Sequence, residues 1–124
     1  MEAVTRILVV DDDTAICLAY SEVLTGAGYE VLTANSRADA MAVLDIVGHD
    51  VHVLILDIRL PDGDGAEVAQ DIADRIGNRP TLYVSGWADD FWDLADAPGR
   101  WRVRQKPIPI PWLLETIEWL AKGE

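Results

Sequence analysis

Three continuous runs of branched apolar residues limit most strongly what this chain can fold into. They lie at residues 7–10, 51–56 and 81–84. Such runs are too continuous for strands with one face in water, so they predict interior strands of a parallel sheet. Two weaker strands are predicted at residues 30–34 and 101–105.

The segments between these strands have helical spacing. Apolar residues recur every three or four positions in 16–27, 40–47 and 69–76, which is typical of helices with one buried face. Gly26 and Gly28 can end the first helix, Ser36 can cap the second, and Pro111 suits the first turn of a last one. Segment 89–97 is rich in aspartate and predicts only a short helix. Strand and helix alternate five times, which indicates an α/β fold with right-handed crossovers.

Length and charge narrow the class of protein. A chain of 124 residues, 50% of them hydrophobic, fits one domain over residues 1–124 and leaves no room for an output domain. A net charge of −12 argues against binding to nucleic acid or anionic lipid. No apolar run approaches the ~20 residues that span a bilayer, so no membrane insertion is expected. The single cysteine, Cys17, cannot form an internal disulfide, and we expect a cytoplasmic protein.

Polar residues stand where the predicted strands end. Asp11 and Asp12 follow the first strand, Asp57 ends the third, Ser85 ends the fourth, and Lys106 follows the fifth. Ligands of open α/β sheets bind at the carboxyl ends of the strands. One pocket is therefore predicted to hold all of these side chains.

The residue types in this pocket point to phosphoryl chemistry. Carboxylates from two strands repel one another unless a cation neutralises them, and an all-oxygen set suits Mg²⁺. A lysine and a hydroxyl beside them suit a transferring phosphoryl group, with Asp57 as its acceptor. Gly63 and Gly65 predict a tight turn into the third helix, and no glycine-rich nucleotide motif is present.

The chain resembles the receiver domains of bacterial response regulators over almost its whole length. The resemblance rests on the motifs Ile7-Leu-Val-Val-Asp-Asp12, Leu56-Asp57, Leu60-Pro-Asp-Gly63, Ser85 and Lys106-Pro107. It implies a doubly wound (βα)5 fold with a five-stranded parallel sheet in the order 2-1-3-4-5.

The resemblance also assigns roles to single residues. It implies that Asp11, Asp12, Asp57 and the backbone carbonyl of Arg59 bind Mg²⁺. It implies that Ser85 and Lys106 contact the phosphoryl group on Asp57, and that a cis peptide precedes Pro107. The implied phosphodonor is a sensor histidine kinase or a histidine phosphotransfer protein. Catalysis would be limited to the domain's own phosphorylation and dephosphorylation.

One departure from the family concerns the conformational switch. The family usually carries Tyr or Phe where Val103 stands. Trp101 has the same strand parity but lies about 6.6 Å further from the site. The sequence around Ser85 resembles a receiver subgroup with Gly and an aromatic residue after the hydroxyl. Trp87 is therefore either a moving aromatic or a fixed surface cover. Arg59 either steers the phosphoryl group or is a surface arginine without a partner, and we expect the second.

A partner surface is predicted near the end of the chain. Trp112 and Trp119 fall opposite the core stripe of the last helix, and Trp101 is flanked by arginines on the edge strand. Trp and Arg are favoured interface residues, so this face would bind a downstream protein or a second copy of the chain. The alternative is that the arginines protect the edge strand and the tryptophans pack on their neighbours.

Two other functions remain open from the sequence. A degenerate receiver would act as a phosphorylation-independent binding adaptor, which Val103 favours and the complete acid, hydroxyl and lysine set opposes. A Mg²⁺-dependent phosphatase with an aspartyl intermediate needs a second acid two residues after Asp57, where Arg59 stands.

Overall fold

The core of the molecule is a parallel sheet. The computed structural model describes residues 4–122, without the side chains of Ala88 and Asp93. The five strands of this sheet are β1 (Arg6–Val10), β2 (Glu30–Ala34), β3 (Val53–Asp57), β6 (Thr81–Ser85) and β7 (Trp101–Gln105). Their order is β2-β1-β3-β6-β7, and every pair is parallel. This confirms the predicted order 2-1-3-4-5.

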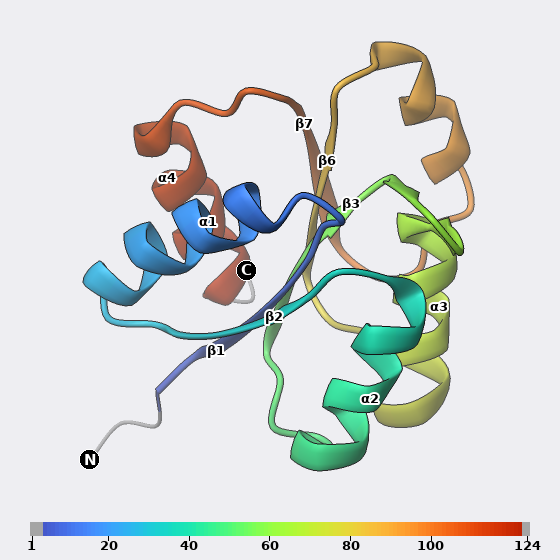
Figure 1. Cartoon of the computed structure of the whole chain (residues 1–124), viewed down its shortest axis with the longest axis horizontal. Helices are drawn as coiled ribbons and strands as arrows, with labels where there is room; N and C mark the ends of the chain where they lie inside the picture. The colour runs from blue at the N-terminus through green and yellow to red at the C-terminus, as the bar shows by residue number, and fades with distance from the viewer. Residues whose placement is uncertain (1–3, 123–124) are drawn as a thin grey trace.

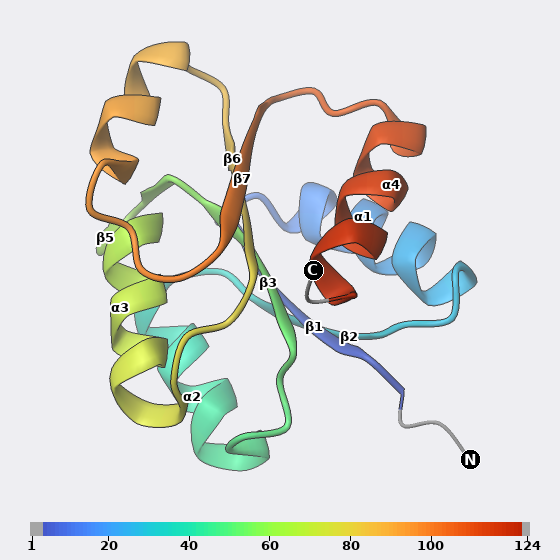
Figure 2. The same cartoon turned by 180° about the vertical axis from the view of Figure 1, so that it is seen from behind.

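Helices cover both faces of this sheet (Figures 1 and 2). On one face lie α1 (Thr14–Gly26) and α4 (Ile110–Ala121), and on the other lie α2 (Arg37–Val47) and α3 (Gly65–Ile76). Ser36 caps α2 as predicted, since its side chain accepts a hydrogen bond from the N–H of Asp39 at 3.0 Å. Pro111 lies in the first turn of α4, where its missing N–H leaves no hydrogen bond unmade.

The sheet separates two hydrophobic clusters. One lies under α2 and α3 and includes Leu54, Leu56 and Tyr83, and the other lies under α1 and α4 and includes Ile55, Leu82 and Val84. Successive residues of β3 and β6 therefore face opposite clusters, because side chains alternate along a strand. Both clusters are apolar, which explains why these strands read as continuous apolar runs.

Two short elements complete the fold. The strands β4 (Arg59–Leu60) and β5 (Gly63–Asp64) pair antiparallel and carry the chain from β3 into α3. This hairpin fits the turn predicted around Gly63. The 3-10 helix η1 (Ala88–Leu94) follows β6 and lies above α3 in Figure 1. It matches the short helix predicted for this segment.

The described residues include no helix that is long and apolar enough to cross a membrane.

Gly65 allows α3 to start against the backbone of β3. A Cβ built at this position would lie 2.6 Å from the backbone oxygen of Asp57. We expect Gly65→Ala to lower the free energy of unfolding by about 1–3 kcal/mol, because backbone atoms must move apart. Urea unfolding followed by circular dichroism measures this loss.

Gly26→Ala is the matched control. A Cβ at Gly26, the last residue of α1, would meet nothing within 4 Å. Alanine is the better helix former, so this variant should be unchanged or more stable by up to about 1 kcal/mol. Equal losses from the two substitutions would contradict the role given to Gly65.

Candidate functional site

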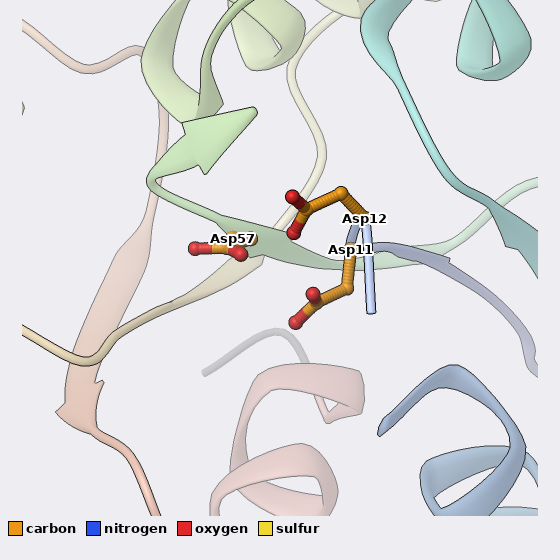
Figure 3. A group of neighbouring side chains, drawn as sticks. All are labelled: Asp11, Asp12 and Asp57. Atoms are coloured by element: carbon orange, nitrogen blue, oxygen red, sulfur yellow. The ribbon is translucent and has the colours of Figure 1, made fainter. Parts of the chain in front are cut away.

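Three aspartates meet at the carboxyl edge of the sheet (Figure 3). Asp11 and Asp12 follow β1, and Asp57 ends β3. Each offers a carboxylate oxygen, and these oxygens lie within 4.8 Å of one another. Asp11 and Asp57 are buried, whereas Asp12 is exposed. The predicted gathering of these three residues is confirmed.

Lys106 joins the aspartates from β7. Its Nζ lies 2.8 Å from Oδ2 of Asp11 and 3.1 Å from Oδ2 of Asp57. The backbone N–H of Lys106 donates to the carbonyl of Ser85 at 2.7 Å, which continues the β6–β7 ladder to this point. The peptide bond to Pro107 is cis, as the sequence resemblance implied.

The charges in this pocket do not balance. Burial, reinforced by the charge of Asp11, raises the pKa of Asp57 to about 6, although Lys106 opposes the rise. Burial of Lys106 disfavours its charge, but its contacts with Asp11 and Asp57 outweigh this effect and raise its pKa, so it remains an ammonium. Three carboxylates gather beside a single lysine. The pocket therefore has an excess of negative charge that a bound cation would neutralise.

The donor set fits a hard divalent cation. All the ligand atoms that the three aspartates offer are oxygens, and the described residues place no histidine or cysteine among them. Mg²⁺ prefers such a set and keeps several waters, which an open site allows. The site opens into a pocket of about 190 Å³ lined by Asp12, Asp57, Arg59, Ser85, Gly86, Trp87 and Lys106.

Ser85 reaches the pocket from the end of β6 but is bonded elsewhere. Its Oγ lies 2.5 Å from Oδ2 of Asp90, to which it donates a hydrogen bond. It also accepts a hydrogen bond of 3.0 Å from the N–H of Trp87. The predicted site residue is thus in the right pocket, and its hydroxyl proton is directed towards η1.

The expectation that Arg59 has no partner is wrong. Its Nε lies 2.9 Å from both carboxylate oxygens of Asp90, and its guanidinium carbon lies 5.6 Å from the centre of the Trp87 ring. Its backbone N–H donates to Oδ1 of Asp57 at 3.2 Å. The proposed use of the Arg59 carbonyl as a metal ligand stays a prediction.

Asp90 is the residue that sequence reasoning missed. It is only 5% exposed, yet nothing in the sequence distinguishes it from its exposed neighbour Asp89.

The structure also gives the positions of Trp87 and Val103, the two switch candidates besides Ser85. Trp87 is 63% exposed, and Val103 packs against the cluster under α2 and α3. Whether Trp87 moves stays a prediction.

The predicted partner face needs a correction, because the three tryptophans do not share one side. Trp101 packs on the α2 and α3 side, with its ring 5.9 Å from that of Tyr83. Trp119 packs on the α1 and α4 side, with the guanidinium groups of Arg100 and Arg102 at 3.6 Å and 3.7 Å from its centre. Trp101 and Trp119 both pack on neighbours, but Trp119 also lines a groove together with Trp112, so partner binding by Trp112 and Trp119 stays a prediction.

A groove remains between β7 and α4. It encloses about 850 Å³, and Trp112, which is 58% exposed, lines it together with Arg102 and Arg104. Binding of a downstream protein or a second copy in this groove stays a prediction.

Removing the charge of Asp57 should stabilise the metal-free fold. Because the pKa is raised from 3.8 to about 6, the folded chain binds this proton more tightly than the unfolded chain, and stability falls as the pH rises through this range. We expect Asp57→Asn to be more stable than the unsubstituted chain by about 1–3 kcal/mol at about pH 8. The gain should shrink by about 1 kcal/mol at about pH 5, where most of Asp57 is already protonated.

Urea unfolding in chelator at both pH values tests this prediction. Asp96→Asn, at an exposed aspartate, is the control and should change stability little at either pH. A gain for Asp57→Asn that is the same at both pH values would show that burial of its charge is not the cause.

Comparison with known proteins agrees with this geometry. Residues 7–118 match the family model of the response regulator receiver domain. The chain is 38% identical over 80 residues to the transcriptional regulatory protein TrcR of Mycobacterium tuberculosis, which covers 64% of this chain and 30% of TrcR. It is 25% identical over 113 residues to the sensor kinase CckA of Brucella abortus, which covers 90% of this chain and 12% of CckA. The chain thus spans less than a third of the length of either relative.

A solved structure shows the same architecture. The CheY-like response regulator receiver domain protein from Methanospirillum hungatei superposes with a TM-score of 0.85 at 28% identity, over 98% of this chain and 96% of that one. The matched model covers nearly all of the described fold and every aspartate of the acidic cluster. This chain belongs to the response regulator receiver domain family.

Proposed function

We propose that the chain is a signalling switch that accepts a phosphoryl group on Asp57 with Mg²⁺ bound beside it. The observation that carries the proposal is the environment of Asp57. Its carboxylate is buried at the base of an open pocket, paired with Lys106 at 3.1 Å, and within 4.8 Å of the oxygens of Asp11 and Asp12. A buried carboxylate with both a cation site and a lysine beside it suits nucleophilic attack on phosphorus.

Each side chain of the site has a distinct role in the proposed phosphoryl transfer. Asp57 has a pKa of about 6, so it is mostly ionised at neutral pH and its oxygen can attack the donor's phosphorus. The new bond from this oxygen to phosphorus forms as the bond between phosphorus and the donor breaks, and no proton has to move. The ammonium of Lys106 stabilises the negative charge that gathers on the phosphoryl oxygens. Mg²⁺, held by Asp11, Asp12 and Asp57, would supply further charge neutralisation.

The proposed phosphodonor is a sensor histidine kinase or a histidine phosphotransfer protein. Support comes from the family and from the match to a segment of the sensor kinase CckA. Catalysis by this chain would then be limited to its own phosphorylation and dephosphorylation. Its cytoplasmic location stays a prediction.

A phosphorylation-independent adaptor is the alternative, and the intact site disfavours it. An adaptor has no use for two buried carboxylates on a single lysine, because that arrangement makes the fold less stable. Asp11, Asp57 and Lys106 nevertheless retain it. The two functions differ in whether Asp57 reacts.

Phosphorylation can be measured as intact mass after incubation with Mg²⁺ and acetyl phosphate. We expect a gain of one phosphoryl group that is lost in Asp57→Asn and in the presence of chelator. Lys106→Ala should reduce the phosphorylated fraction at a fixed time by about tenfold or more, since one charge-stabilising group is lost.

Lys122→Ala is the matched control for Lys106→Ala. Lys122 is exposed and pairs with Glu118 on α4 at 3.1 Å, so its loss should leave the phosphorylated fraction unchanged. The absence of a mass gain, together with no binding of beryllofluoride and Mg²⁺, would overturn the proposed function in favour of the adaptor.

A further inference from the structure

Asp90 is a buried carboxylate that the proposed phosphoryl transfer does not use. It lies in the first turn of η1 and is 5% exposed. A charged group is costly to bury, so its partners show what it is held for. They are Ser85 and Arg59, and both belong to the pocket that contains Asp57.

The first partner, Ser85, donates to Asp90 the hydrogen bond that a phosphoryl oxygen on Asp57 would otherwise accept. The hydroxyl of Ser85 carries a single proton, and its shortest contact is the one of 2.5 Å to Oδ2 of Asp90. The carbonyl of Trp87 is a more distant acceptor at 3.1 Å. A charged acceptor at short distance is the stronger one. Ser85 therefore cannot donate to a phosphoryl oxygen on Asp57 while it donates to Asp90.

The second partner keeps the carboxylate charged and in place. Arg59 binds Asp90 through Nε at 2.9 Å to each oxygen, and through Nη2 at 2.8 Å to Oδ1. The Arg59 side chain is 63% exposed, whereas that of Asp90 is 6% exposed, so the arginine closes over the carboxylate from the solvent side. The same residue donates its backbone N–H to Asp57. Arg59 thus contacts both the predicted acceptor and the group that holds Ser85.

The segment η1 is attached by apolar packing and by the polar contacts of Asp90. Leu94 is buried in the cluster under α2 and α3, and Phe91 is partly buried there. The helix has no side-chain hydrogen bond at its N-cap, Trp87. At the start of η1, Asp90 accepts a hydrogen bond from Ser85 at the end of β6 and pairs with Arg59 of β4.

These contacts place two acceptors in competition for one hydroxyl. A phosphoryl group on Asp57 adds a charge of about −1.5 to −2 and three strong acceptor oxygens. We propose that Asp90, clamped by Arg59, is a positioning residue that holds the Ser85 hydroxyl away from the phosphoryl site. Phosphorylation then breaks the bond between Ser85 and Asp90, so η1 loses this contact with the end of β6 while Arg59 still holds the carboxylate. This inference rests on the proposed phosphorylation of Asp57.

The latch formed by Ser85, Asp90 and Arg59 would report the state of Ser85 without an aromatic ring at Val103. The strand β7 carries no aromatic side chain at that position to report the state of Ser85. The latch instead transmits that state to η1, with the exposed Trp87 between Ser85 and Asp90 in the chain.

Binding of beryllofluoride with Mg²⁺, a phosphoryl mimic, tests the latch. Dissociation constants can be measured by tryptophan fluorescence for the unsubstituted chain, Asp90→Ala and Asp89→Ala. We expect Asp90→Ala to bind about tenfold more tightly, because the competing acceptor for Ser85 is gone. Asp89→Ala removes the same charge from an exposed neighbour and should bind as the unsubstituted chain does. Asp90→Asn keeps the shape with a weaker acceptor and should show a smaller gain, which covers the case in which Asp90→Ala does not fold.

A double-mutant cycle shows whether the effect passes through the hydroxyl. In a Ser85→Ala background, Asp90→Ala should no longer change the affinity, whereas in a Ser85→Thr background the tenfold gain should return. A purely structural role of Asp90 would not depend on the hydroxyl in this way.

The outcomes separate the latch from the proposed function. Tighter binding by Asp90→Ala that needs the Ser85 hydroxyl supports the latch. Equal binding by the unsubstituted chain, Asp90→Ala and Asp90→Asn overturns the latch and leaves the phosphoryl site standing. No binding by any variant, together with no mass gain from acetyl phosphate, overturns the proposed function and the latch with it.

Discussion

The buried carboxylates of Asp11 and Asp57 both pair with the single ammonium group of Lys106. The rest of the site depends on this excess of negative over positive charge. Ion pairs in a buried setting need good geometry to offset the loss of hydration. The parallel sheet supplies that geometry, since β1, β3 and β7 bring the three residues to one edge from distant parts of the chain. The remaining negative charge makes the edge receptive to a metal cation, and it is also why Asp57 holds its proton more tightly than an ordinary aspartate.

Most of the sheet could be predicted because its central strands are buried on both sides. The apolar runs of β1, β3 and β6 have no other stable place in a chain of this size. The ends of elements were harder to predict. The third strand begins at Val53, not at residue 51, because the N–H of Arg6 donates to the side-chain Nδ1 of His52 in place of a backbone carbonyl of this segment. The strands β4 and β5 have two residues each, too few to leave a periodic pattern.

The site could be predicted where its residues end strands, and not where they meet through side chains. Asp11, Asp57 and Lys106 follow from the topology alone. The pairing of Arg59 with Asp90 joins residues 31 positions apart through a short helix whose placement no periodicity fixes. The prediction that Trp101 shares a face with Trp112 and Trp119 was wrong for a related reason. Trp101 and Arg102 point to opposite sides of β7, but the sequence does not say which side α4 covers.

The sheet also divides the hydrophobic core into two clusters. Leu94 and Phe91 of η1 belong to the cluster under α2 and α3, whereas the helices α1 and α4 rest on the other cluster. A rearrangement of η1 would therefore involve the packing of the cluster under α2 and α3. A protein that binds the η1 side would therefore distinguish the phosphorylated from the unphosphorylated domain. One that binds the α1 and α4 side would contact helices that pack on the other cluster.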